Sequence, residues 1–109
     1  MTTRPDTLQG SLPLLILTIL ARRGPLHGYG ITAQIQRLSD QLRVEEGSLY
    51  PALYRMEEAG WIKAREITTD HKRRARAYEI TAQGRRQLGL EEARWHSTTN
   101  AINHVLKHA

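Results

Sequence analysis

The period of the hydrophobic pattern changes at Gly60, and this change limits the possible folds more than any other feature of the chain. Before Gly60, apolar residues recur three and four positions apart, which is the spacing of an amphipathic helix. After it, two short segments alternate apolar with polar side chains, as half-buried strands do. The pattern predicts helices over residues 11–23, 28–38 and 48–59, followed by strands over residues 61–67 and 76–80 that pair as a hairpin.

Two of the predicted helix starts depend on the position of a proline. We expect Ser11 to cap the first helix, with Pro13 in its first turn. If Ser48 caps the third helix, Pro51 occupies the third helical position, where its missing N–H has no intrahelical acceptor. An earlier start of the third helix would require a kink at Pro51.

The last helix is expected over residues 82–109, with Thr81 as its N-cap. Leu88, Trp95 and Ile102 lie one heptad apart on this helix. Such a stripe is typical of a helix that packs against a partner helix. Because a chain of 109 residues buries only a modest core of its own, we expect a second copy of the chain to cover the stripe.

Together these elements predict a mainly α fold with a small β-hairpin (α+β), namely a winged helix-turn-helix with a long C-terminal dimerisation helix. We expect residues 1–9 to form a flexible N-terminal arm, residues 10–81 a winged helix DNA-binding domain and residues 82–109 the dimerisation helix. In a helix-turn-helix, the second helix of the pair enters the major groove and presents side chains to base edges. Here that helix is the third one.

The composition is compatible with a polyanionic partner and excludes several other classes of protein. A net charge of +5 attracts phosphates, although charge alone does not separate nucleic acid from a membrane surface. Without cysteine, the chain cannot form disulfides or thiolate metal sites. The longest apolar run, residues 12–20, is too short to span a bilayer, and no signal-peptide cleavage site follows it. We therefore expect a cytoplasmic protein without membrane contact.

The outer face of the third helix is the first candidate DNA-binding surface. Leu49, Leu53 and Met56 share its inner face. The side chains on the outer face and at the exposed N-terminus can bind phosphates or base edges, and they are Ser48, Tyr50, Pro51, Tyr54 and Arg55. The alternative is a solvated helix face, since most polar side chains on a small helix have no specific partner.

The hairpin is the second candidate surface, because the segment between its strands, residues 68–75, holds the densest positive charge of the chain. Its cations are Lys72, Arg73 and Arg74, and Arg76 follows in the second strand. A basic hairpin tip can lie along the DNA backbone or insert an arginine into the minor groove. The alternative is an exposed basic loop that only keeps the protein soluble.

Four segments of the chain resemble the PadR family of bacterial transcriptional regulators. They are residues 24–31 (GPLHGYGI), 46–53 (EGSLYPAL), 58–62 (EAGWI) and 73–84 (RRARAYEITAQG). The resemblance implies a winged helix homodimer that represses a promoter through a palindromic site in double-stranded DNA. It places the DNA contacts of the family on Ser48, Tyr50, Pro51 and Tyr54, and on Lys72, Arg73 and Arg74.

The chain is also similar to the short PadR subgroup, which has one C-terminal helix and in which some members bind flat aromatic compounds between the protomers. Trp95 falls where those members have a tryptophan that lines the binding pore. The resemblance therefore implies a repressor that a planar aromatic small molecule releases from DNA. Trp95 can equally anchor the dimer core, because a tryptophan in a heptad stripe buries a large apolar area without any ligand.

Other functions have weaker support in the sequence. His104 and His108 have the spacing of two metal ligands on one helix face, but a third ligand is missing, so we expect no metal and no cofactor. The sequence contains no nucleophile elbow, zinc-protease motif or phosphate loop, which argues against an enzyme. A winged helix adaptor that binds a protein and has lost DNA binding stays open as the alternative.

Overall fold

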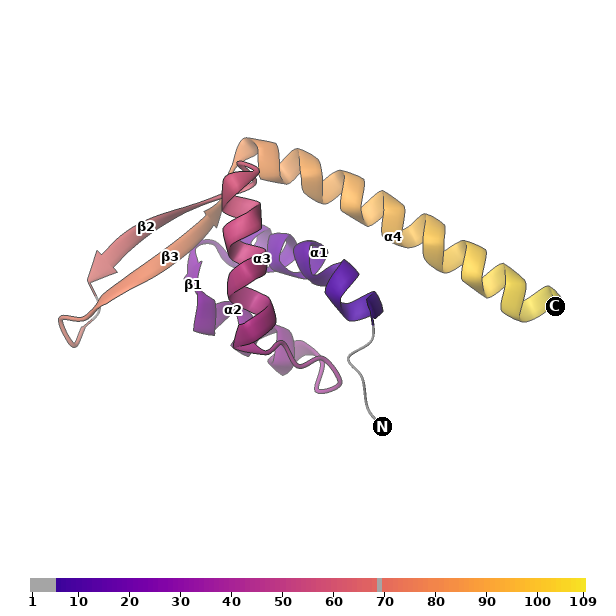
Figure 1. Cartoon of the computed structure of the whole chain (residues 1–109), viewed down its shortest axis with the longest axis horizontal. Helices are drawn as coiled ribbons and strands as arrows, with labels where there is room; N and C mark the ends of the chain where they lie inside the picture. The colour runs from indigo at the N-terminus through magenta and orange to yellow at the C-terminus, as the bar shows by residue number, and fades with distance from the viewer. Residues whose placement is uncertain (1–5, 69) are drawn as a thin grey trace.

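The computed structural model describes residues 6–68 and 70–109. Its elements in chain order are α1 (Asp6–Arg23), β1 (Leu26–His27), α2 (Gly28–Leu38), α3 (Glu46–Glu58), β2 (Ile62–Thr68), β3 (Arg74–Ile80) and α4 (Ala82–His108). The hairpin of β2 and β3, here called the wing, projects from one side of the helices, and α4 extends away on the other side (Figure 1). The predicted winged helix-turn-helix with a small β-sheet and a long C-terminal helix is confirmed.

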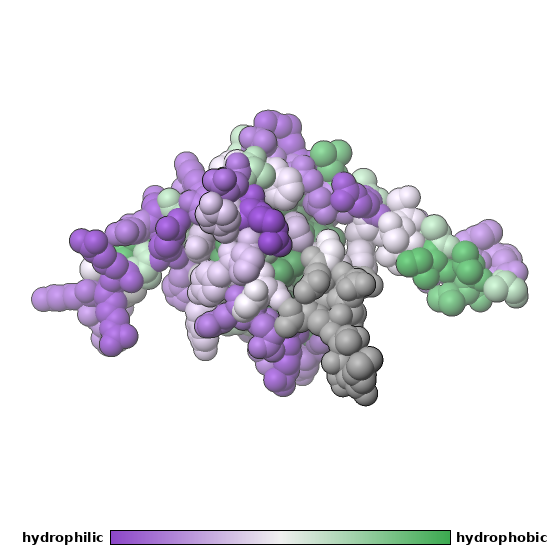
Figure 2. Space-filling view, viewed as in Figure 1, coloured by the Kyte–Doolittle hydropathy of each residue, from purple (hydrophilic) through white to green (hydrophobic). Residues whose placement is uncertain are grey.

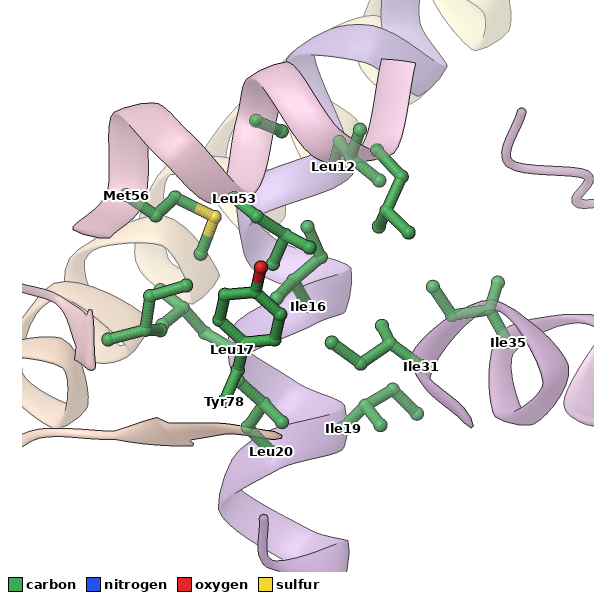
Figure 3. Packing of buried hydrophobic residues seen from close by; sticks show 13 residues of the cluster. Leu12, Ile16, Leu17, Ile19, Leu20, Ile31, Ile35, Leu53, Met56 and Tyr78 are labelled. Carbon is green, nitrogen blue, oxygen red and sulfur yellow. The ribbon is translucent and has the colours of Figure 1, made fainter. Parts of the chain in front are cut away.

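The hydrophobic core lies where α1, α2, α3 and β3 meet (Figure 3). Its most buried large side chains are Ile16, Leu17, Leu20, Ile31, Leu49, Leu53, Met56 and Ile62. Burial of one such side chain stabilises a fold by about 1.5–3 kcal/mol. Because α3 uses its inner face for this core, its outer face is left at the surface.

β3 is the central strand of a three-stranded antiparallel sheet with the order β1-β3-β2. The predicted hairpin is confirmed, and its register pairs Ile62 with Ile80 and Thr68 with Arg74. The sequence does not predict β1, because a strand of two residues is too short to show alternation. β1 pairs Leu26 with Tyr78, and this pairing holds the start of α2 beside the wing.

The predicted start of the first helix is wrong. α1 begins at Asp6 rather than after Ser11, so Pro13 lies inside the helix and not in its first turn. The residues before and after Pro13 are both helical. The proline removes one backbone hydrogen bond from the first half of α1. Residues 6–9 therefore belong to α1, and the rest of the expected arm, residues 1–5, lies outside the described residues.

The start of the third helix, which Pro51 leaves open in the sequence, is the earlier of the two alternatives. α3 begins at Glu46, with Glu45 as its N-cap, because the N–H groups of Ser48 and Leu49 both donate to the Glu45 carbonyl, at 3.0 and 2.9 Å. Pro51 is consequently inside the helix. Its missing N–H leaves the carbonyl of Gly47 without an intrahelical donor, and Gly47 is exposed, so water can hydrate that carbonyl.

The end of α3 is bonded to the start of α4. Gly60 follows α3 with a φ of 82°, the left-handed conformation predicted for a glycine after a helix end. Thr81 caps α4 as predicted: its hydroxyl accepts from the Gly84 N–H at 3.0 Å and donates to the Gly60 carbonyl at 2.6 Å. The side-chain amide of Gln83 donates to the carbonyl of Ala59 at 3.2 Å.

Candidate nucleic-acid interface

The outer face of α3 is exposed, as the sequence predicts. The side chains buried on the inner face are Leu49, Ala52, Leu53 and Met56. On the opposite side, Tyr54 is 66% exposed and Tyr50 is 45% exposed. Pro51 and Arg55 are exposed as well, and Ser48 is half-buried. Three of these residues, Ser48, Pro51 and Arg55, line a recess of about 260 Å³ at the start of α3, together with Leu12 and Gly47.

All four predicted cations of the wing are exposed. Lys72 and Arg73 lie in the loop between the strands, whereas Arg74 and Arg76 belong to β3, so the loop is shorter than residues 68–75. Lys72 has a φ of 60°, in the left-handed region, where the chain reverses direction. Figure 2 shows the hydrophilic residues that gather on the wing, at the left of the view.

A groove of about 510 Å³ runs between the wing and the starts of α2 and α3. Its lining residues are His27, Gly28, Tyr29, Tyr50, Arg73, Arg74, Ala75, Arg76 and Tyr78. Tyr50 of α3 thus shares one groove with three arginines of the wing. The structure therefore brings Tyr50, from the set predicted on α3, together with three arginines of the wing, whereas Ser48, Pro51 and Arg55 line the separate recess at the start of α3.

The start of α2 forms a wall of this groove that the sequence analysis does not assign to the site. Nδ1 of His27 caps the helix by accepting from the Gly30 N–H at 3.0 Å, and Tyr29 is 75% exposed. A Cβ atom at Gly28 would lie 2.7 Å from the hydroxyl of Tyr50, so the tyrosine lies against α2 only because residue 28 has no side chain. Gly28 belongs to the GPLHGYGI segment that resembles the PadR family, but no spacing in the sequence places residue 28 beside residue 50.

Carboxylates pair with two of the wing arginines in different ways. Nη2 of Arg76 donates to both carboxylate oxygens of Glu57, at 3.2 and 3.1 Å. Nη1 of Arg74 lies 3.8 Å from a carboxylate oxygen of Glu66. Glu66 belongs to the wing itself, whereas Glu57 belongs to α3. Arg76 therefore bonds to another element, and Arg74 pairs within the hairpin.

Trp95 lies apart from the groove beside the wing. It lines a recess of about 220 Å³ between α1 and α4, whose other lining residues are Gly10, Ser11, Leu14, Glu91, Arg94 and Thr98. The indole is 40% exposed. The carboxylate of Glu91 accepts from the side-chain amide of Gln87 at 2.8 Å and lies 3.8 Å from Arg94. The structure therefore places Trp95 in a second, separate candidate site.

The two histidines near the end of α4 are neighbours, with ring centroids 4.4 Å apart for His104 and His108. Over residues 6–68 and 70–109, no three side chains of the metal-ligating kinds come together. Over the same residues, no helix is long and apolar enough to cross a membrane.

Comparison with known proteins gives a consistent result. The sequence model of the PadR-like family of transcriptional regulators matches residues 16–90. A transcriptional regulator from Clostridium thermocellum is 31% identical with a TM-score of 0.84, and the match covers 92% of this chain and 97% of that one. A PadR-like transcriptional regulator from Bacillus cereus is 26% identical with a TM-score of 0.79, over 96% of this chain and 100% of that one.

A curated relative is longer than this chain. An uncharacterized 37.1 kDa protein in a transposon of Streptomyces fradiae is 41% identical over 78 residues, which are 72% of this chain and 21% of that protein. The chain thus spans about a fifth of the length of this relative.

Proposed function

The chain belongs to the PadR-like family of transcriptional regulators, and we propose that it is a sequence-specific regulator that binds double-stranded DNA as a homodimer. The observation that most supports DNA binding is the groove in which Tyr50 of α3 lies opposite Arg73 and Arg74 of the wing. The proposal assigns DNA binding to residues 10–81 and dimerisation to residues 82–109. Regulation of transcription is not a catalytic activity, so the proposal includes no reaction.

In this proposal α3 enters the major groove and the wing lies along the DNA backbone. Tyr50, Pro51 and Tyr54 face base edges, and Ser48 and Arg55 bind phosphates that flank the groove. Lys72, Arg73 and Arg74 bind the backbone or the minor groove next to it. The concave surface between α3 and the wing supports this arrangement, because a duplex is convex and negatively charged.

The exposed apolar face of α4 supports dimerisation. Leu106, Val105 and Ile102 are 76%, 63% and 53% exposed, which is unusual for a cluster of aliphatic side chains. Figure 2 shows hydrophobic residues grouped near the C-terminal end of α4, away from the wing. A second copy packed on this face would bury them. A twofold dimer would then place two α3 helices in successive major grooves, about 34 Å apart.

We further propose that the protein represses transcription. A planar aromatic effector that binds at Trp95 would relieve this repression. The recess beside Trp95 supports this extension, since it has an exposed indole face and the aliphatic side chain of Leu14. Aromatic and apolar walls with a few polar groups are typical of small-molecule sites. A planar ligand would stack on the indole and change the angle between the protomers, which would alter the spacing of the two α3 helices.

A gel-shift titration of the protein against the DNA upstream of its own gene tests the proposal. Tyr54→Ala should weaken binding to that DNA more than binding to a scrambled duplex of equal length, since Tyr54 contacts bases. Arg73→Ala should weaken both, since Arg73 contacts the backbone. Lys107→Gln, at the far end of α4, is the control for loss of one positive charge and should bind as the wild type does. No binding of the wild type at low salt would contradict the proposal and favour an adaptor that binds protein.

Tryptophan fluorescence tests the effector site. Planar cationic dyes should quench the emission of the wild type in a saturable way and release it from DNA. The Trp95→Phe variant retains Trp61, so it reports any quenching that does not arise at the recess. Equal quenching of both proteins, or none, would leave Trp95 as a packing residue of the dimer.

A further inference from the structure

Arg76 occupies a different position from the other cations of the wing. Its guanidinium carbon lies 5.8 Å from the ring centre of Tyr78, and the Tyr78 ring belongs to the hydrophobic core. Its Nη2 donates to both oxygens of Glu57, in α3. One side chain thus connects β3, the core and the helix that is proposed to enter the major groove.

We propose that Arg76 is a positioning residue, which fixes the wing against α3 through Glu57 and does not itself bind a DNA phosphate. This inference rests on the proposed function of the surface, and it replaces the DNA contact that the sequence predicts for Arg76. Tyr50 and Arg76 both line the groove, and Glu57 belongs to the same helix as Tyr50, so the pair of Arg76 with Glu57 holds the wing at its distance from α3.

The charge of Glu57 supports a positioning role for Arg76. If Arg76 left Glu57 to bind a phosphate, the carboxylate of Glu57 would lose its counter-charge beside a polyanion, and the like charges would repel. Glu57 is the more buried partner, with its side chain 35% exposed against 57% for Arg76. The ion pair of Arg76 with Glu57 is therefore expected to remain intact when DNA is bound.

Two other ion pairs of the wing cannot have the same effect. Arg74 with Glu66, at 3.8 Å, and Lys63 with Glu79, at 3.6 Å, both join β2 to β3. Such pairs stiffen the hairpin but do not determine its angle to α3. Arg74 also has an 86% exposed side chain, which suits contact with a phosphate.

Removal of the negative charge at Glu57 gives the sharpest test, because the two possible roles of Arg76 predict opposite changes in DNA affinity. If the pair positions the wing, Glu57→Gln weakens DNA binding by about two- to fivefold, the range expected for loss of a surface ion pair. If Arg76 binds phosphate, Glu57→Gln removes a repulsive charge and tightens binding. Glu66→Gln is the matched control within the wing and should tighten binding slightly.

Arg76→Gln and the double variant with Glu57→Gln and Arg76→Gln complete a double-mutant cycle. The positioning role predicts that Arg76→Gln weakens binding as much as Glu57→Gln does, and that the double variant is no weaker than either single one. The positioning role also predicts that the DNA affinity of Arg76→Gln depends on salt as that of the wild type does, because no counterion release is lost. Loss of a phosphate contact in both protomers would instead lower the slope of log K against log salt by about two.

Backbone ¹⁵N relaxation of the free protein separates this inference from the proposed function. With the pair broken, order parameters of residues 63–67 and 75–79 should fall relative to those of α2. A looser wing in both single variants supports the positioning role even if the protein binds no DNA. A wing of unchanged order, tighter DNA binding by Glu57→Gln, or a slope reduced by two in Arg76→Gln would each overturn it.

Discussion

The contact of Tyr50 with Gly28 shows how one missing side chain shapes the candidate interface. Gly28 is buried at the start of α2, and the Tyr50 hydroxyl occupies the space that a Cβ atom would fill. Tyr50 is held there on the edge of the groove that contains the wing arginines. The lack of a side chain at residue 28 can therefore determine where the tyrosine proposed to contact DNA lies.

Gly28→Ala should weaken DNA binding more than it weakens the fold. The new Cβ displaces the far end of a tyrosine side chain rather than backbone, so the variant should fold with little change in Tm, while Tyr50 moves out of its place. Thermal unfolding and a DNA titration on the same preparation check both parts.

The matched control for this variant is Gly89→Ala, since residue 89 lies on the exposed side of α4 with no neighbouring atom within 4 Å. That change should raise stability by about 0.5–1 kcal/mol, because alanine loses less entropy in a helix. It should leave DNA affinity unchanged. Unaltered DNA affinity of Gly28→Ala would show that the place of Tyr50 does not matter for binding.

At this scale, the sequence predicts which α3 residues face inward and which face outward, because helical periodicity determines that division. It does not predict the pair of Arg76 with Glu57. The two residues are 19 positions apart, and only the packing of the wing against α3 brings them together. Nor does it predict Gly28 beside Tyr50, for the same reason.

Side-chain hydrogen bonds join the end of α3 to the start of α4. Thr81 both caps α4 and donates to the carbonyl of Gly60, and Gln83 reaches the carbonyl of Ala59. The long helix is thus tied directly to the end of the helix that is proposed to read DNA. A rotation of α4 should turn α3 with it.

Thr81→Ala removes the hydrogen bonds of the hydroxyl to Gly84, Gly60 and Trp61 and should destabilise the fold by about 1–2 kcal/mol, the upper part of the range for loss of an N-cap. Thr81→Ser retains the hydroxyl and should lie much closer to the wild type. Denaturant unfolding of the two variants gives the comparison. Equal loss of stability in both would mean that the methyl group, and not the cap, is the stabilising part.

The predictability of the elements follows the strength of their local signals. α2 begins and ends where its period predicts, and the cap of α4 is the predicted threonine. The starts of α1 and α3 differ from those that the prolines suggest, because both helices extend for several residues before Pro13 and Pro51. β1 exists only because β3 offers it a partner.

At the scale of the whole molecule, the wing and the apolar end of α4 lie at opposite ends (Figure 1). The wing has the exposed cations Lys72, Arg73 and Arg74, as expected of a DNA-binding surface, and the other end has the aliphatic cluster expected of a protein interface. Because α4 is bonded to the end of α3, a change at the proposed dimer interface on α4 would alter the spacing of the two proposed DNA-binding surfaces.

Substitution of Ile102 by glutamate should produce a monomer, since two carboxylates would face each other in the proposed interface without a counter-charge. Sedimentation measures the change in mass, and the far-ultraviolet spectrum checks that the helices persist. Asn103→Glu, next to it in the sequence, adds the same charge outside the Leu88, Trp95 and Ile102 stripe and should stay dimeric. A dimeric Ile102→Glu protein would place the interface elsewhere.

Two copies of the surface formed by α3 and the wing are proposed to bind one DNA duplex. The most direct test is the salt dependence of affinity for a palindromic duplex, with the number of protomers per duplex counted in the same titration. If Arg55, Lys72, Arg73 and Arg74 of both copies each neutralise one phosphate, log K should fall linearly with log salt with a slope of about −7 between about 50 and 200 mM. Two protomers should bind each site. A flat salt dependence, or saturation by a single protomer, would contradict the account.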